Sequence, residues 1–301
     1  METGNVIRAN NFNSLFLQAI DTIRTNGKWT NPRGFECKEL VGALLILTDP
    51  NKCLVTIKDR KLNYAYLIIE KFMYLTGKSM PEVLLAYNPN MKNYMNDETG
   101  DFDGAYGPRI GNQFEWCYQE LKQDRDSRRA IVTIHNDKDC NSETKDSACT
   151  LSWHFMIRDG KLDMLVNMRS NDLLWGLCLD VPAFCFAQEV MACWLGIPMG
   201  RYLHYDSSLH YYKEFEEKLL GYLKPDEQPE DDYLINNLNA VNDEKNPVWD
   251  IPFDQTFEAF NLFWRNEELL RKTGEYLDTP FPVINSYLAR LKRFWDAKAN
   301  H

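Results

Sequence analysis

The residues best suited to chemistry are one cysteine, two arginine-containing runs and one carboxylate. Cys149 stands twenty residues before the run Arg169-Ser170-Asn171-Asp172, and Asp180 follows eight residues after that run. A cysteine thiolate is a strong nucleophile, and the planar guanidinium of arginine binds two oxygens of an anion at once. A second basic run, Ser127-Arg128-Arg129, precedes the cysteine. This order predicts covalent chemistry on a ligand that carries an anionic group.

The other cysteines show no pattern of their own. Among the eight cysteines there is no C-x-x-C pair and no Cys/His spacing that is typical of zinc, so we expect no metal site. Most of the eight are predicted to be small buried apolar residues, and this remains the alternative for Cys149.

The bulk composition limits the classes of partner. With 301 residues, of which 44% are hydrophobic, the chain can form one large domain or a main domain with an appendage. Its net charge of −10 argues against nucleic acid or an anionic membrane as a partner, so a phosphate ligand would need a local cluster of arginines. No apolar run of about 18 residues is present, and the N-terminal residues lack the features of a signal peptide. We therefore expect a cytoplasmic protein.

Hydrophobic spacing predicts alternating helices and strands in the first two thirds of the chain. The expected helices cover residues 14–26, 62–77 and 181–195, and the last is apolar on all sides and therefore central. The expected strands cover 41–49, 53–57, 129–135 and a hairpin that turns at Asp159-Gly160. Loop-rich composition covers 87–111 and 136–147, and the second loop places Cys149 at the start of a strand.

The C-terminal quarter has a different character. Residues 224–246 are rich in Pro, Glu, Asp and Asn and predict an exposed linker, and helices are expected at 257–273 and 283–297. We therefore divide the chain into a main domain, residues 1–223, and a linker with a helical extension, residues 224–301, that packs on the main domain.

Two carboxylates lie next to strongly apolar segments. Glu70 belongs to the apolar helix predicted at 62–77, where it is either a solvent-facing residue beside Lys71 or a buried acid with a shifted pKa. Asp180 precedes the central helix, where it is either an N-cap or a ligand-binding group, and the two roles are compatible.

Several motifs in this order resemble the thymidylate synthase family, which includes the pyrimidine nucleotide hydroxymethylases. The similarity covers about residues 20–212. It consists of Ser127-Arg128-Arg129, Cys149, the hairpin Asp159-Gly160-Lys161-Leu162, the run Arg169-Ser170-Asn171-Asp172 with Gly176, and His210-x-Tyr212 after Gly200. The resemblance implies an α/β (α+β) fold in which a buried central helix and flanking helices pack on a mixed sheet, here with a helical C-terminal extension.

The chemistry of that family explains the nucleophile. Addition of a thiolate to carbon 6 of a pyrimidine makes carbon 5 nucleophilic enough to take a one-carbon unit. By resemblance, Cys149 is the nucleophile and Arg169 is its cationic neighbour, which would lower the pKa of the thiol. The resemblance also implies 5,10-methylenetetrahydrofolate as the one-carbon donor, with no metal.

The resemblance assigns roles to further residues. The nucleotide phosphate would bind a set of arginines and one serine, namely Arg128, Arg129, Arg169 and Ser170, with Arg33 as a weaker candidate. Arg128 and Arg129 would reach into the partner's site, which implies a homodimer; the alternative is a solvated charge pair. The other implied roles are water and proton transfer for Glu70, proximity to the nucleophile for Tyr106, folate binding for Asp172 with Glu70, and sugar binding for His210 and Tyr212. An ordinary, partly buried His and Tyr are the alternative for the last two.

Asp180 carries the prediction of the base. Thymidylate synthases have Asn at this point, and an amide can both accept from uracil and donate to it. An ionised Asp cannot donate, whereas cytosine presents an amino donor and can carry a proton on its ring nitrogen. Because mismatched buried groups stay unpaired, such a site can reject the wrong base by a factor of about 10⁴. We therefore expect 5-hydroxymethylation of a cytidine monophosphate, with dCMP ahead of CMP because Ser170 follows the deoxynucleotide pattern.

The sequence departs from the family at several points. Ala148-Cys149-Thr150 replaces the usual Pro-Cys-His, and Tyr106-Gly107-Pro108-Arg109 replaces Tyr-Gly-x-x-Trp-Arg. The short C-terminal tail with which thymidylate synthases close the site has no counterpart here, and a site open to water would yield a hydroxymethyl rather than a methyl group. The alternatives are a thymidylate synthase that methylates dUMP and a non-catalytic nucleotide- or RNA-binding protein that kept the fold.

Overall fold

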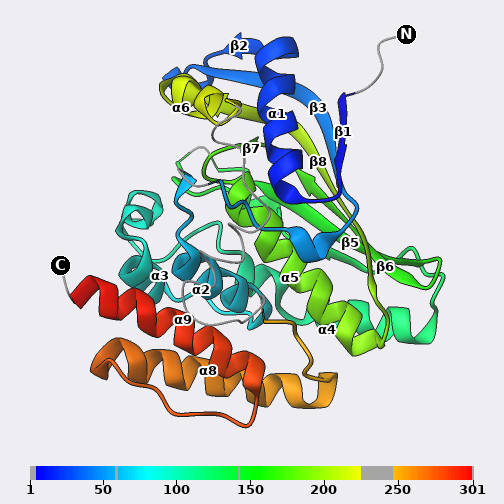
Figure 1. Ribbon diagram of the computed structural model, residues 1–301, viewed down its shortest axis with the longest axis vertical. Coiled ribbons are helices and arrows are strands. Elements are labelled where there is room, and N and C mark those ends of the chain that lie inside the picture. Colours follow the sequence, from blue (N-terminus) through cyan, green and yellow to red (C-terminus); the bar gives the residue numbers. More distant parts are fainter. Residues whose placement is uncertain (1–4, 58–59, 142, 225–246, 300–301) are drawn as a thin grey trace.

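A mixed sheet forms the centre of the protein (Figure 1). The computed structural model describes residues 5–57, 60–141, 143–224 and 247–299. The sheet order is β1 (Asn5–Ala9), β3 (Cys37–Leu47), β8 (Met199–Tyr212), β6 (Lys161–Met168), β5 (Thr150–Arg158) and β4 (Ile131–Thr133), while β2 (Lys28–Thr30) pairs with β3 and β7 (Asn171–Asp172) pairs with β8. The predicted hairpin is confirmed, because β5 and β6 pair antiparallel and both turn residues have positive φ.

Side chains alternate between a covered and an open face of this sheet, as the pleat of a strand requires. On the covered face, Leu45 and Trp153 are fully buried. On the other face, Leu44 lies opposite Val6 and Tyr205 in the register of its two neighbouring strands. Val6 is 58% exposed and Tyr205 is 38% exposed, so one face of the sheet is left uncovered in the single chain.

The central helix α5 (Leu177–Leu195) packs on the covered face (Figure 1). It includes the predicted segment 181–195 and begins four residues earlier, after the N-cap Gly176. By length and composition α5 could cross a membrane, but 72% of its most apolar window is buried inside the protein, as in the core helix of a globular fold.

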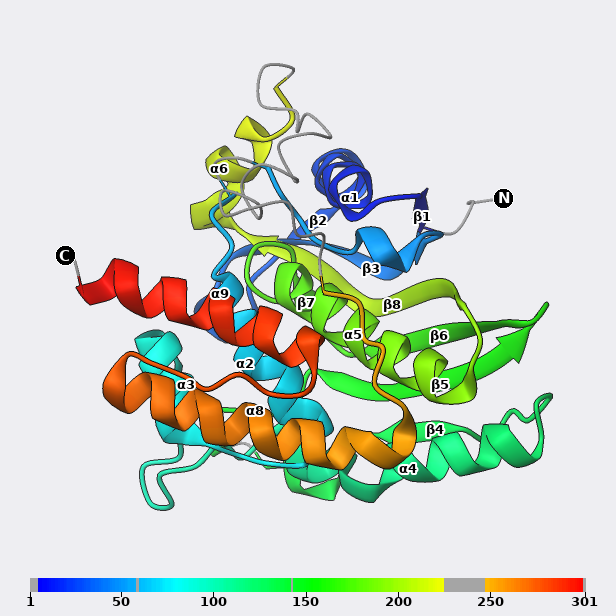
Figure 2. The same cartoon turned by 60° about the horizontal axis from the view of Figure 1, so that its bottom comes forward.

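The remaining helices cover the edges of this two-layer core. Helix α1 (Phe12–Asn26) packs on β3, whereas α2 (Tyr64–Leu75) and α4 (Tyr106–Gln123) pack against α5. Helix α3 (Pro81–Tyr87) packs against α2, and α6 (Glu216–Gly221) follows β8. Figure 2 shows α8 (Phe253–Thr273) and α9 (Pro282–Ala299) side by side against α2 and α3. Phe72 of α2 stacks on Phe263 of α8 with ring centroids 3.8 Å apart, so the predicted C-terminal helices share a core with the rest of the chain. The predicted linker at 224–246 lies outside the described residues, apart from residue 224.

Two predictions of local structure are wrong. Residues 53–57 form no strand, because the side chain of Asn13 takes the place of a strand partner and bonds both the backbone N–H and the hydroxyl of Thr56 at 2.8 Å. The predicted loop at 87–111 ends at Tyr106, where α4 begins. Gly107 permits this start, since a Cβ atom there would lie 2.2 Å from the carbonyl oxygen of Lys78.

The N-cap interpretation of Asp180 is also wrong. Asp180 lies in the first turn of α5, where its backbone N–H donates to the carbonyl of Gly176 at 2.8 Å. The carboxylate that orders the loop before α5 is that of Asp172. It accepts hydrogen bonds from the backbone N–H groups of Leu174, Trp175 and Gly176 at 2.8 to 3.0 Å. The side chain of Asp180 is therefore available for another role.

Candidate active site

The Cys149 thiol and the Arg169 guanidinium meet at one end of the β5–β6 hairpin. Cys149 immediately precedes β5 and Arg169 immediately follows β6, and the backbone N–H of Arg169 donates to the carbonyl of Cys149 at 2.9 Å. The guanidinium donates to the carbonyls of Ala148 and Ser147, at 2.9 and 2.8 Å, and its Nη2 lies 3.5 Å from Sγ of Cys149. The loop carbonyls thus hold a fixed positive charge against the thiol.

The environment of Cys149 opposes its ionisation. Burial raises the pKa of the thiol from 9.0 to about 11, and the negative charges of Asp180, Asp146 and Asp172 act in the same direction. Arg169 partly offsets these effects by lowering the pKa. The thiol is therefore predominantly protonated near pH 7, and its activation requires a group that accepts the proton.

Tyr106 lies near the Cys149 thiol, the position expected from the resemblance. Its hydroxyl accepts a hydrogen bond from the backbone N–H of Thr150 at 3.1 Å and lies 3.0 Å from the Thr150 hydroxyl. Burial, followed by the charge of Cys149, raises the pKa of Tyr106 well above its usual value. The neutral side chain of Tyr106, in the first turn of α4, therefore holds Thr150, the first residue of β5 and the neighbour of Cys149, in place.

Glu70 is an acid that titrates in the physiological range. It projects from α2, and its Oε1 accepts a hydrogen bond from the Tyr66 hydroxyl at 3.0 Å. Burial raises the pKa of Glu70 from 4.5 to about 7, against the opposing effect of hydrogen bonds from Tyr74 and Tyr66. Its second oxygen, Oε2, has no hydrogen-bond partner among the described residues. The buried-acid interpretation of Glu70 thus fits the structure better than a solvent-facing residue.

Asp180 shares this environment with other carboxylates. Burial raises its pKa well above the usual value, and the negative charges of Glu70, Asp172 and Asp206 add to the effect. A hydrogen bond from the Asn171 amide partly offsets these contributions. The surroundings of Asp180 therefore favour its neutral, protonated form.

The predicted sugar and phosphate residues lie at the neighbouring ends of β7 and β8. Asp172 pairs with His210 in the register of these strands, and the rings of His210 and Tyr212 meet edge to face with centroids 5.2 Å apart. His210 is buried, and burial raises the pKa of Tyr212, an effect that the positive charge of the exposed Arg33 partly offsets. Ser170, half-buried, connects Arg169 to β7.

Arg128 and Arg129 are not part of this cluster within one chain. Both are exposed, and the Nε atom of Arg129 lies 3.8 Å from a carboxylate oxygen of Glu120. Burial lowers the pKa of His154, on the open face of the sheet, and interaction with the backbone of Arg128 opposes this shift. The two arginines therefore lie beside the open face, with no hydrogen bond or ion pair to the Cys149 site in the described parts of the chain.

The surroundings of Asp172 fit a folate. Three backbone N–H groups use three of the roughly four acceptor positions of its carboxylate, which leaves one for a donor on a flat ring. Trp175, 52% exposed, presents an aromatic surface in the same loop, with the guanidinium of Arg60 5.8 Å from its ring centroid. Among the described residues the buried Nε of Arg60 has no hydrogen-bond partner, so it could donate to an anionic group of a ligand. Among the described residues, no group of three or more His, Cys, Asp or Glu side chains could hold a metal ion.

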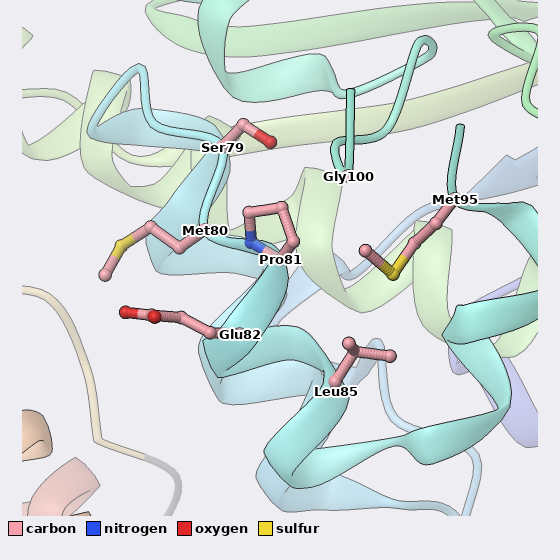
Figure 3. A pocket seen from close by; sticks show the side chains of 7 residues that line it. All are labelled: Ser79, Met80, Pro81, Glu82, Leu85, Met95 and Gly100. Carbon is pink, nitrogen blue, oxygen red and sulfur yellow. The ribbon is translucent and has the colours of Figure 1, made fainter. Parts of the chain in front are cut away.

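A separate pocket lies beside the start of α3 (Figure 3). It is lined by Ser79, Met80, Pro81, Glu82, Leu85, Met95 and Gly100. None of the predicted site residues lines it, and Glu82 is the one titratable side chain among these seven. The chemistry is therefore to be sought at Cys149 rather than in this pocket.

Several residues of the site were missed from the sequence. Tyr66 and Tyr74 precede and follow Glu70 by four positions, so helical spacing alone could have placed them beside it. Asn171 was recognised only as part of a run, and nothing in the sequence indicated its contact with Asp180. His204 and Asp206 are far from both in the chain and reach them only through the sheet register.

Comparison with known proteins agrees with this geometry. Residues 14–261 match the family model described as thymidylate synthase. The similar proteins include deoxyuridylate hydroxymethyltransferases of three phages. That of Bacillus phage SP01 is 32% identical over 293 residues, 91% of this chain and 73% of that protein. That of Delftia phage PhiW-14 is 27% identical over 242 residues, 75% of this chain and 68% of that protein. That of Pseudomonas phage M6 is 31% identical over 169 residues, 54% of this chain and 48% of that protein. The chain belongs to the thymidylate synthase family, and it is accordingly an enzyme of one-carbon transfer from methylenetetrahydrofolate to a pyrimidine nucleotide.

Proposed function

We propose that this protein adds a hydroxymethyl group to carbon 5 of dUMP, with methylenetetrahydrofolate as the one-carbon donor and water as the source of oxygen. The observation that carries the chemistry is the Arg169 guanidinium 3.5 Å from the Cys149 thiol. The charge of Asp180 acts on this thiol, and the charge of Glu70 acts in turn on Asp180. The choice of dUMP and of hydroxymethylation is supported by the names of the three phage relatives. The cytidylate predicted from the sequence finds no such support.

The proposed reaction proceeds through a covalent bond between Cys149 and the pyrimidine. The Cys149 thiolate forms a bond to carbon 6 of the pyrimidine, and the electron pair of the 5,6 double bond moves to carbon 5, which then bonds the one-carbon unit. Loss of the proton on carbon 5, together with cleavage of the bond between the one-carbon unit and the folate nitrogen, releases tetrahydrofolate and leaves an exocyclic methylene on the pyrimidine. Water adds to this methylene and loses a proton to Glu70, and elimination of Cys149 restores the double bond.

Asp180 can recognise uracil when the carboxyl group of Asp180 is protonated and therefore neutral. A protonated carboxyl group accepts through its carbonyl oxygen and donates through its hydroxyl, so it can pair with the ring N–H and the carbonyl of uracil as an amide does. The prediction of cytosine assumed an ionised Asp180. The burial of Asp180 among other carboxylates favours the neutral form instead and thereby removes the argument against uracil.

We further propose that the nucleotide spans the ends of β7 and β8. Arg169, Ser170 and Arg33 are assigned to the phosphate, because guanidinium groups bind phosphate oxygens in pairs. His210 and Tyr212 are assigned to the sugar hydroxyl. Asp172, with Glu70, is assigned to the folate on the other side of the base.

The open face of the sheet supports a homodimer. It presents apolar residues from strand to strand, including Val6, Leu44, Tyr205 and Ile131, and monomeric proteins rarely expose contiguous apolar surfaces of this kind. Arg128 and Arg129 lie beside this face, so a second copy seated on it would receive both arginines near its own site. We therefore propose that Arg128 and Arg129 bind phosphate in the partner subunit.

Mixing two inactive variants tests the shared site. Cys149→Ala removes the nucleophile, and a double Arg128→Leu, Arg129→Leu variant removes only the arginines. If subunits exchange randomly, half of the dimers are mixed and each contains one intact site, so the mixture should recover about a quarter of wild-type activity. Sedimentation of the wild type should give the mass of a dimer. A monomer in solution, or an arginine variant with wild-type activity, would contradict the proposal.

Competition between nucleotides tests the substrate. With methylenetetrahydrofolate and heavy-oxygen water, dUMP should yield labelled 5-hydroxymethyl-dUMP, and kcat/KM for dUMP should exceed that for dCMP by at least about tenfold, equivalent to about 1.4 kcal/mol. Asp180→Asn should keep dUMP turnover within about tenfold, because an amide, like a neutral carboxyl group, accepts from the ring N–H of uracil and donates to its carbonyl.

The same assay separates the alternatives. Formation of dihydrofolate, followed by absorbance, with an unlabelled methyl product would identify a thymidylate synthase. Preferred turnover of dCMP, lost in Asp180→Asn with a gain for dUMP, would restore the cytidylate prediction. Binding of nucleotide without turnover of either base would leave a non-catalytic binding protein.

A further inference from the structure

The first turn of α4 holds both chain neighbours of the reactive thiol. The Tyr106 hydroxyl bonds Thr150, which follows the thiol. Arg109, three residues further on the same side of the helix, donates to the carboxylate of Asp139 at 2.5 Å. That carboxylate accepts a hydrogen bond at 2.9 Å from the backbone N–H of Ala148, which precedes the thiol. The thiol therefore lies between two residues that are both connected to one helix.

Asp139 is a buried carboxylate with both oxygens in use. Its side chain is 1% exposed. Oδ2 accepts from Arg109 and from the backbone N–H of Asn136 at 2.9 Å, and Oδ1 accepts from Ala148. Burial raises the pKa of Asp139, but these hydrogen bonds outweigh burial and lower the pKa from 3.8 to about 2. Asp139 is therefore ionised at neutral pH.

Arg109 fixes the position of Asp139. The guanidinium is 9% exposed and also donates to the carbonyl oxygens of Ile134 and Asp103, at 3.1 and 2.6 Å. A buried ion pair is weak evidence for stability, because the cost of desolvation offsets the attraction. What this pair provides is a carboxylate that is held in one place beside Ala148.

Ala148 connects this ion pair to the cation beside the thiol. Its carbonyl oxygen accepts from Nε of Arg169 at 2.9 Å, and the carbonyl oxygen of Ser147 accepts from Nη2 at 2.8 Å. Nη2 in turn lies 3.5 Å from Sγ of Cys149. Because Asp139 holds the N–H of Ala148, it also limits the directions in which the neighbouring carbonyl groups can point.

We propose that Asp139 is a positioning residue, which anchors the backbone at Ala148 and thereby keeps the guanidinium of Arg169 against the thiol. This inference rests on the proposed function, in which that thiol is the nucleophile. The positive charge of Arg169 favours the thiolate, whereas the neighbouring carboxylates oppose it. An anchor that keeps Arg169 close therefore makes the thiol more reactive.

The residue at position 148 shows why this chain needs such an anchor. Members of the family usually have proline where this chain has Ala148. The ring of a proline restricts its own backbone and leaves no N–H to be bonded. Alanine lacks this restriction, and its N–H is bonded by Asp139 instead. The hydrogen bond from Ala148 to Asp139 thus supplies a restraint that a proline would supply through its ring.

Two acids of the same loop provide a matched pair of substitutions. Asp139→Asn keeps the shape of the side chain but has one acceptor oxygen, which the adjacent guanidinium takes, so its NH₂ group faces the N–H of Ala148 and that bond is lost. Asp146→Asn is the control. Asp146 accepts from the backbone N–H of Gly104 at 2.9 Å, a bond that an amide oxygen can keep. Both variants remove one negative charge, and only Asp139→Asn removes the anchor.

The two variants should change the alkylation of Cys149 by iodoacetamide in opposite directions. The pKa of this thiol is about 11, so at pH 8 the rate follows the small thiolate fraction. Asp146→Asn removes a charge that raises this pKa and should increase the rate by about two- to fivefold. Asp139→Asn should lower the rate by about three- to tenfold, because a higher pKa reduces the thiolate fraction more than it increases nucleophilicity. Mass spectrometry of the peptide that contains Cys149 separates its rate from those of the other cysteines.

The sign of the change separates a positioning role from a structural one. Loss of a nearby negative charge, or a looser loop that exposes the thiol, would increase the rate of alkylation. An unchanged or higher rate in Asp139→Asn would therefore overturn the proposal. In an Ala148→Pro background, Asp139→Asn should change the rate by less than about twofold, because no N–H is left for Asp139 to hold. A full loss in that background would also overturn it.

A second variant covers the case in which Asp139→Asn does not fold. Arg109→Lys keeps the positive charge but cannot reach all three acceptors of the guanidinium, so it should lower the alkylation rate by about threefold, and an unchanged rate would overturn the proposal. In the folded variants, kcat/KM for dUMP should fall together with the alkylation rate. If the wild type turns over no nucleotide, the proposed function fails, while the alkylation rates still decide the role of Asp139.

Discussion

Replacement of Cys149 by alanine is expected to abolish turnover of dUMP, with a loss of at least about 10⁴-fold in kcat. In the proposed mechanism the thiol makes the covalent bond without which carbon 5 of the pyrimidine is not a nucleophile, and among the described residues no other thiol adjoins Arg169. Nucleotide binding should survive, because Arg169 is held by the carbonyls of Ser147 and Ala148 and not by the thiol alone.

The matched control for this variant is Cys140→Ala. Cys140 is an exposed free cysteine in the loop that leads to Cys149, so its removal should leave kcat and KM unchanged. Calorimetry with dUMP would measure the binding of each variant. Turnover by Cys149→Ala within tenfold of wild type would exclude the covalent mechanism, and loss of dUMP binding together with turnover would point to a folding defect instead.

Much of the fold could be predicted because burial follows local periodicity. The segments that became α2, α5 and the β5–β6 hairpin bury repeating faces, and each was predicted within a few residues of its observed bounds. Prediction failed where a tertiary contact replaced a local one, as at Thr56, whose backbone bonds to the side chain of Asn13. It also failed at α4, where Pro108 suggested a loop although the first turn of a helix tolerates proline.

The residues that form the site could be predicted from the sequence, but the protonation states of its acidic side chains could not. The spacing of Cys149 and Arg169 follows from the two ends of a hairpin, so the sequence could indicate the pair. The protonation of Asp180 could not be read in the same way, because it depends on Glu70, Asp172 and Asp206, which arrive from α2, β7 and β8. The choice between cytosine and uracil was therefore beyond a prediction that treated Asp180 as an isolated ionised group.

Glu70 and Asp180 are proposed to act in different protonation states within one site. Glu70 has a pKa of about 7 and is substantially ionised at neutral pH, whereas the negative charge of Glu70 itself helps to keep Asp180 protonated. Pairs of acids whose environments separate their protonation states are typical of enzymes that need both a base and a donor. The ionised Glu70 would accept the proton from water, and the neutral Asp180 would hold the base.

Replacement of Glu70 by glutamine is therefore expected to slow turnover by about 10²- to 10⁴-fold and to change its pH dependence. If Glu70 acts as the base, as proposed, wild-type kcat/KM should fall as pH decreases through about 7, the pKa of its carboxyl group. Glutamine cannot accept a proton, so Glu70→Gln should lack this decrease. Glu82→Gln, an exposed residue of α3, is the matched control and should keep the wild-type profile. A decrease near pH 7 that persists in Glu70→Gln would assign that titration to another group.

The same substitution should have the opposite effect on stability. The pKa of Glu70 is raised from 4.5 to about 7 on folding, so the folded state disfavours the ionised form and loses stability as pH rises from about 4.5 to 7. A shift of this size corresponds to at most roughly 3 kcal/mol, and glutamine does not incur the loss. Urea unfolding should therefore show Glu70→Gln to be more stable than wild type at pH 8 and nearly equal to it at pH 4. Equal stability of the two proteins at pH 8 would mean that folding does not raise the pKa of Glu70. The assignment of Glu70 as a base with a pKa near 7 would then be contradicted.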